Sequence, residues 1–179
     1  MRVILCFWLT PAKQAFMYFM HGRYYGGSFL FIDGEETPVM YFAEPRRVFR
    51  RKEIKKCTLD EIDYLELDVS PEEGRRLKSM CQACVDARKP FNLKDLVLMY
   101  APFFVDELSV SDAPTLNNTQ MIILFLRECL DKDNVLVRAI EDMHSRRTML
   151  DAVYERLHPY SKVVKLSMLD GRLVESSVL

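Results

Sequence analysis

The chain has 179 residues, of which 49% are hydrophobic, and a formal net charge of −1. This length and composition are typical of one globular domain with a core of its own. The near-neutral charge indicates no strongly acidic or basic partner. No window approaches the roughly 18 apolar residues that a membrane-spanning helix requires.

The first part of the chain is predicted to be rich in β-strands. The apolar stretch from Met1 to Leu9 is interpreted as a buried first strand, in preference to a signal peptide. Asp33-Gly34 predicts a hairpin turn. The other elements expected here are a helix over 12–21 and strands over 28–32, 39–43 and 62–69.

Helices are predicted to dominate the second part. Ser70, followed by Pro71 and Glu73, predicts a capped helix that ends near Lys89. We expect residues 1–170 to form a single domain and residues 171–179 to be a frayed tail. The remaining expected elements are a helix over 93–100, a loop over 103–113, a long helical region over 133–157 and a final strand over 161–168.

Two asparagines precede the most apolar run of the chain. Asn117 followed by Gln120 is a capping-box pattern, and the run from Met121 is apolar on most sides, which predicts a central buried helix near 118–130. Some hydrolases place a nucleophilic cysteine at the start of such a helix, because the positive end of the helix dipole stabilises a thiolate. Here the position holds amides and a hydroxyl.

The order of these elements predicts an α+β fold, with a small, mostly antiparallel sheet packed against several helices. Four local sequences, in this order, resemble the permuted papain-like superfamily. This is the group around the bacterial cell-wall peptidase NlpC and lecithin retinol acyltransferase, with permuted relatives in large DNA viruses. The segments that carry the resemblance are Tyr25-Gly26-Gly27-Ser28-Phe29-Leu30, Met40-Tyr41-Phe42-Ala43-Glu44, Arg88-Lys89-Pro90-Phe91-Asn92 and Asn118-Thr119-Gln120-Met121-Ile122.

The resemblance implies a permuted papain-like fold whose catalytic residues have been lost. The nucleophile position of the superfamily matches Asn118, and neither Asn118 nor Asn117 can act as a thiol nucleophile. The position of the superfamily's histidine falls near Gly27, on Gly26, Gly27 or Ser28. The chain is therefore expected to be a pseudoenzyme, since a fold does not carry an activity by itself.

Other candidate chemistry is weaker. Cys81 and Cys84 form a C-x-x-C pair within an apolar helical stripe, so they are interpreted as buried core thiols. His21 is expected to be a loop or interface residue and His144 to lie at a helix kink or on the surface, and Cys129 lies at the far end of its helix. No metal site is expected, because the three histidines are scattered and there is no second cysteine pair. No cofactor is expected either.

A basic stretch follows the second predicted hairpin strand. Such a cluster can bind phosphates or acidic protein surfaces, but a solvated strand face and loop is the favoured interpretation, with an acidic segment directly after it. A nucleic-acid-binding domain would be more basic overall, so nucleic acid or another polyanion is a partner we do not favour. The cationic residues are Arg46, Arg47, Arg50, Arg51, Lys52, Lys55 and Lys56.

Two functional hypotheses follow. The first is a non-enzymatic structural or protein-interaction protein, a component of a viral particle by analogy with the viral relatives, with other proteins or a large assembly as partners. The alternative is a thiol-dependent hydrolase or acyltransferase with a misaligned nucleophile. The odd number of cysteines, five, disfavours a disulfide scaffold, so we expect an intracellular, cytoplasmic protein, with the virion as the other location.

Overall fold

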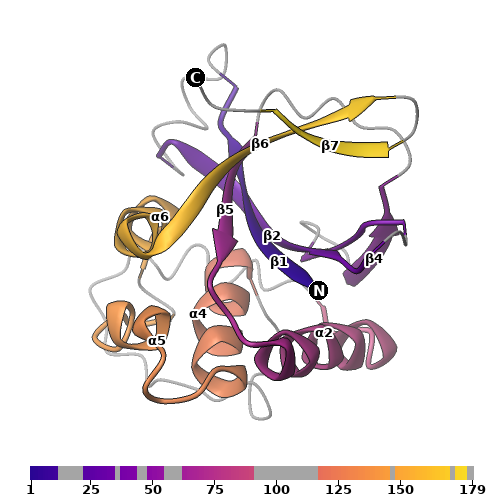
Figure 1. The fold of residues 1–179 in the computed structure, drawn as a ribbon. Helices are drawn as coiled ribbons and strands as arrows, with labels where there is room; N and C mark the ends of the chain where they lie inside the picture. The colour runs from indigo at the N-terminus through magenta and orange to yellow at the C-terminus, as the bar shows by residue number, and fades with distance from the viewer. Residues whose placement is uncertain are drawn as a thin grey trace.

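The computed structural model describes residues 1–11, 22–34, 37–43, 48–54, 62–90, 117–145, 148–169 and 172–176. These residues form one antiparallel sheet of seven strands, with helices gathered on one side of it (Figure 1). The strand order is β4-β3-β2-β1-β5-β6-β7, and every pair of neighbours is antiparallel. The predicted α+β class with a mostly antiparallel sheet is therefore confirmed.

Most predicted elements lie close to their expected positions; the helices over 12–21 and 93–100 and the loop over 103–113 fall outside the described residues. The helices are α2 Pro71–Asp86, α4 Asn118–Cys129, α5 Val135–Ala139 and α6 Leu150–Leu157, followed by the 3-10 helix η1 His158–Tyr160. The strands are β1 Arg2–Leu9, β2 Tyr24–Ile32, β3 Val39–Ala43, β4 Phe49–Glu53, β5 Ile62–Leu67, β6 Ser161–Leu169 and β7 Arg172–Ser176.

The sheet buries apolar side chains on both faces. On β1, Leu5 and Phe7 belong to the core shared with the helices, whereas Ile4 and Cys6 belong to a second cluster on the opposite face. This alternation follows from the two-residue period of a strand. The central helix α4 is buried on almost every side, as its sequence predicted, and residues 121–126 are each at most 4% exposed.

The long helical region predicted over 133–157 contains two separate helices, α5 and α6, with a break between them. The guanidinium of Arg127 donates to the carbonyls of Ile140, Glu141 and Met143. These carbonyls bond to a side chain at the end of α4, outside any continuing helix, so the chain is held in a turn after α5.

The C-terminal residues also differ from the prediction, since residues 172–176 form β7 where a frayed tail was expected. The strand pairs with β6 along its length. Glu175 of β7 accepts hydrogen bonds from Arg2 at 2.7 Å and from Lys162 at 2.8 Å. Backbone pairing and these charge-assisted bonds together order the segment, a combination that local composition did not reveal.

No helix in the described part of the chain is long and apolar enough to cross a membrane.

Both predicted capping boxes are present. Ser70 and Glu73 cap α2 reciprocally, and Asn117 and Gln120 do the same for α4. Glu73 does more than cap its own helix. Its carboxylate also accepts from the backbone of Asp131 and from the Asn134 side chain, each at 3.0 Å.

The Glu73 carboxylate therefore joins the start of α2 to the segment between α4 and α5. Burial raises the pKa of this carboxyl group, but the hydrogen bonds from Asp131, Ser70 and Asn134 outweigh burial and lower it to about 2. The side chain is needed in its charged form, because every partner is a donor.

The low pKa of Glu73 predicts a specific loss of stability in acid. The folded-state pKa of about 2 lies below the ordinary value of 4.5, so the stabilisation is complete above about pH 4.5 and is lost as pH falls toward 2. Glu73→Gln should cost about 1–3 kcal/mol at pH 7, because it leaves buried donors poorly paired. Urea unfolding at pH 7, 4 and 3 measures the free energy of unfolding of both proteins. The difference between variant and wild type should become smaller at each lower pH. A constant difference would contradict the assignment.

Candidate functional site

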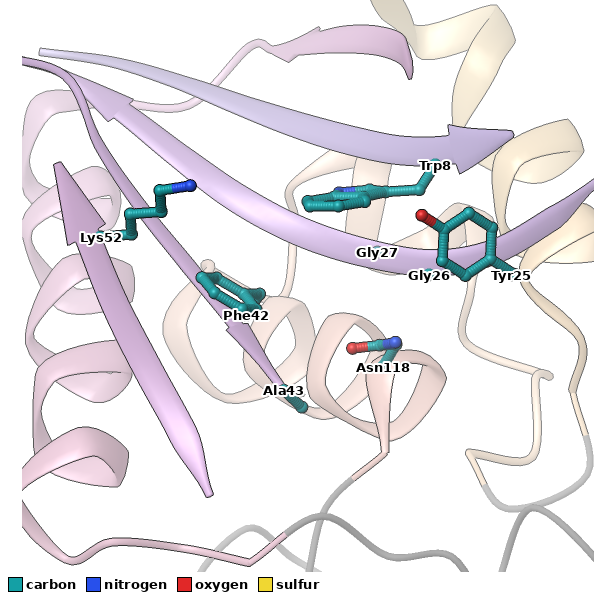
Figure 2. Close-up of a pocket in the computed structure, with 8 residues that line it drawn as sticks. All are labelled: Trp8, Tyr25, Gly26, Gly27, Phe42, Ala43, Lys52 and Asn118. Atoms are coloured by element: carbon teal, nitrogen blue, oxygen red, sulfur yellow. The ribbon is translucent and has the colours of Figure 1, made fainter. Parts of the chain in front are cut away.

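A pocket opens where the N-terminus of α4 meets the ends of β2 and β3 (Figure 2). Its volume is about 300 Å³. It contains both positions singled out by the resemblance, Asn118 and the glycine pair at 26–27. The lining residues are Trp8, Tyr25, Gly26, Gly27, Phe42, Ala43, Lys52 and Asn118.

Asn118 is placed by the cap of its helix. When the side-chain amide is rotated so that its oxygen and nitrogen exchange places relative to Figure 2, the nitrogen donates to two carbonyls. These are the carbonyls of Ala43, at 3.1 Å, and Gly27, at 3.2 Å. The drawn orientation would direct the amide oxygen at these two oxygens, so the turned one satisfies the hydrogen-bonding pattern. The ladder between β2 and β3 ends at the pair Ser28–Phe42. Asn118 therefore bonds the carbonyls just beyond the ladder and ties α4 to both strands.

The two glycines beside Asn118 face different surroundings. A Cβ on Gly26 would lie 3.5 Å from the Asn118 side-chain amide. A Cβ on Gly27 would lie 2.7 Å from Cδ1 of Ile122 and 3.3 Å from Cδ2 of Leu150, inside the helix-facing core.

Gly26 is consequently the position whose side chain would face Asn118. The resemblance places the superfamily's histidine near Gly27, on Gly26, Gly27 or Ser28, so Gly26 is one of the three expected positions. The Ser28 hydroxyl accepts a hydrogen bond from Nε1 of Trp8 at 3.1 Å. The structure brings together the two regions that the resemblance paired. Strand alternation places residues 26 and 28 on one face and Gly27 on the other, toward Ile122.

Aromatic side chains form the walls of the pocket, a feature that the sequence analysis missed. The ring centroid of Trp8 lies 6.2 Å from that of Tyr25 and 6.3 Å from that of Phe42. Trp8 is opposite Gly26 in the pairing of β1 with β2. A glycine opposite a tryptophan leaves space beside the indole, so this pair could have indicated a pocket only once the register was known.

The described residues that line the pocket include no cysteine, histidine, aspartate or glutamate. The ionisable groups among these described lining residues are the Lys52 amine and the Tyr25 phenol. This set offers apolar contact, a cation and the Asn118 amide, which suits binding better than nucleophilic catalysis.

The four cysteines in the described ranges are all buried. Burial raises the pKa of Cys81, of Cys84 and of Cys129, and that of Cys129 reaches about 11. The interpretation of Cys81 and Cys84 as core thiols is confirmed. A thiol that stays protonated at neutral pH is a poor nucleophile.

Of the two candidate histidines, His144 lies in the described part of the chain and does not line the pocket. His21 lies outside the described residues. His144 lies in the turn between α5 and α6, where its carbonyl accepts hydrogen bonds from the backbone and hydroxyl of Thr148. Across the described ranges, no three His, Cys, Asp or Glu side chains come together as a metal site would require.

The basic stretch is divided by the fold. Arg46, Arg47, Lys55 and Lys56 lie outside the described residues. Arg50, Arg51 and Lys52 are on β4, at one edge of the sheet, opposite Phe42, Tyr41 and Met40 respectively.

Because side chains alternate along a strand, Arg51 points to the α2 side of the sheet, while Lys52 lines the aromatic pocket on the other side from Asn118 (Figure 2). Charged residues on an edge strand also oppose pairing with another chain. The three described cations are therefore divided between the two faces of the sheet.

Comparison with protein-family models, with curated proteins and with solved structures gives no match to this chain.

The two adjacent glycines give a matched test of the site geometry. Gly27→Ala should destabilise the protein by about 1–3 kcal/mol, since its methyl group would overlap Ile122 in a packed core. Gly26→Ala should stay within about 1 kcal/mol of wild type, because its methyl group meets Asn118 at an ordinary contact distance. Chemical denaturation of both variants measures the difference. Equal losses would show that the two positions do not face different sides.

The role of the Asn118 amide is tested by a second pair of variants. Asn118→Ala should cost about 1–2 kcal/mol, through loss of hydrogen bonds to the two strand carbonyls. Asn118→Asp should cost more at pH 7, because a carboxylate has no donor for the carbonyls. Thermal and urea unfolding measure both effects. A wild-type stability for Asn118→Asp would mean that the amide nitrogen is not the group that matters.

Proposed function

We propose that this chain is a non-enzymatic structural or protein-interaction protein built on a degenerate, permuted papain-like fold. One observation carries the proposal. The residue that matches the superfamily's nucleophile is an asparagine, and its amide nitrogen bonds to the carbonyls of Ala43 and Gly27.

Papain-like chemistry needs a thiolate activated by an imidazole. An amide at 118 supplies no nucleophile, and a glycine at 26 supplies no base in the position that faces it. The buried thiols have pKa values raised by burial, so they are poor substitutes. The loss of both partners at one place favours a pseudoenzyme over a misaligned thiol enzyme.

Part of the element order supports the proposed fold. A strand, a glycine-containing strand and a returning strand come first, then β4 and β5, and then α2, which precedes the buried helix α4. The N-terminus of that buried helix meets the glycine-containing strand. This is the juxtaposition that the resemblance requires for a nucleophile and its histidine.

Other proteins are the partners we propose, in a large assembly. A viral particle is the assembly we favour, because relatives in the resembled superfamily are encoded by large DNA viruses. The aromatic walls formed by Trp8, Tyr25 and Phe42 would contact a partner, since aromatic residues are enriched in protein interfaces. Cytoplasm and virion are the corresponding locations.

Thiol reactivity distinguishes the two functional hypotheses. In a Cys57→Ser background, the four remaining thiols should react with a thiol-directed reagent only after denaturation, because they are buried in the fold. Cys57 lies outside the described residues, and comparing the wild-type protein with this background gives its contribution to the labelling. Fast, selective labelling of one native thiol at neutral pH would favour the thiol enzyme and contradict the proposal.

A variant with a restored cysteine tests whether the catalytic base has also been lost. Asn118→Cys should hydrolyse no ester or peptide substrate, because Gly26 provides no imidazole to activate the new thiol. Asn118→Cys with Gly26→His restores both groups and serves as the comparison. Hydrolysis by the single variant would overturn the proposed absence of a base.

The structural role is tested on native material. Affinity purification from the source cells or particles, followed by sedimentation, should recover the protein in a large assembly. Alanine at Trp8 should weaken that association more than alanine at the exposed Tyr160. A protein that sediments alone at physiological concentration would contradict the structural role.

A further inference from the structure

A second recess lies between α2 and the strands β3 and β4. Its volume is about 480 Å³. One wall comes from a single stripe of α2, formed by Arg75, Lys78, Ser79 and Gln82. The spacing i, i+3, i+4, i+7 places these residues on the same face of the helix. We refer to this recess as the α2 groove.

The opposite wall comes from the sheet. Tyr41 of β3 and Arg51 of β4 are directly paired in register, so they project to the same side. The hydroxyl of Tyr41 donates to Oε1 of Gln82 at 3.0 Å, and Nε2 of Gln82 donates to Asp86 at 2.8 Å. The first bond links β3 to α2 across the α2 groove, and the second holds the Gln82 side chain along α2.

The charges of the α2 groove are mainly positive. Among the described lining residues, Arg51, Arg75 and Lys78 stand against one carboxylate, that of Asp33. Lys78 lies 3.8 Å from Asp33, which is half exposed, and such exposed pairs contribute little.

Two guanidinium groups supply the capacity to bind an anion. Arg51 lies 3.6 Å from Glu53 on its own strand and also interacts with the Tyr41 hydroxyl, so two partners share the five donors of its planar group. Within the described residues, Arg75 makes no ion pair or side-chain hydrogen bond. Guanidinium groups bind phosphate oxygens through two parallel hydrogen bonds.

We propose that the α2 groove binds a small phosphorylated molecule, with Arg51 and Arg75 on the phosphate groups and Lys78 as an additional cation. The three cations line one recess whose volume suits a small ligand. A nucleic-acid strand needs a longer positive track and a more basic domain than a chain of net charge −1 offers. This site is on the other side of β4 from the pocket at Asn118 and does not depend on the function proposed above.

Sodium pyrophosphate is the probe for this site. Calorimetric titration of the full chain in 150 mM NaCl should show saturable binding at one site. Amide resonances should shift mainly along 75–82 and on β4. Arg75→Gln should weaken binding at least about tenfold, the effect of losing one bidentate charge-assisted pair. Arg51→Gln should act in the same direction.

Arg138→Gln is the matched control, since Arg138 is exposed on α5 and pairs only with exposed Asp133 among the described residues. Its affinity for pyrophosphate should equal that of wild type. Arg75 is exposed, so its variant should fold normally, and thermal unfolding checks this. The absence of saturable binding, or equal affinity in wild type and Arg75→Gln, would overturn the proposal. So would tighter, Arg75-dependent binding of a single-stranded oligonucleotide than of pyrophosphate, which would identify a nucleic-acid surface instead.

Discussion

The buried start of α4 is the constraint on which the rest of the structure depends. The helix lies in the core with residues 121–126 almost fully buried, so its first backbone groups have little access to water. Unpaired groups there would each cost about 1–3 kcal/mol. Asn117 and Gln120 satisfy two of them, and both side chains are at most 4% exposed. Asn118 then bonds to strands β2 and β3, so its side-chain amide holds the start of α4 against the sheet.

This structural role limits what the pocket can do. An amide suits position 118 because its nitrogen can donate to two carbonyls at once, which a thiolate cannot do. Gly27 is equally constrained, since any side chain there would enter the core beside Ile122. Gly26 is not constrained in this way, and its small size leaves the space beside Trp8 that forms the pocket. The residues that bind the core together and those that shape the pocket are therefore neighbours on the same two elements.

The edge strand β4 contributes to two separate surfaces. Arg51 faces α2 and the positively charged groove, whereas Lys52 faces the aromatic pocket. The position of α2 depends on Glu73, whose carboxylate joins the helix to the segment after α4. The α2 groove consequently depends on the hydrogen bonds of Glu73 at the N-terminus of α2, while the pocket depends on the capping box of α4. Each surface is held by a buried polar group.

Local signals in the sequence determined the elements that are defined by neighbouring residues. The caps at Ser70 and Asn117, the first strand and the buried character of α4 were all predictable, because each depends on spacing within a few positions. The β7 strand and the break after α5 were not, since Glu175 and Arg127 act through partners distant in the chain. The resemblance named Asn118 and the residues 26–28, and the structure places Asn118, Gly26 and Gly27 at one pocket. Only tertiary structure decided that Gly26 faces Asn118, that Trp8 walls the pocket and that Arg51 and Lys52 lie on opposite faces. Those facts depend on strand register, which is set by pairing between distant segments.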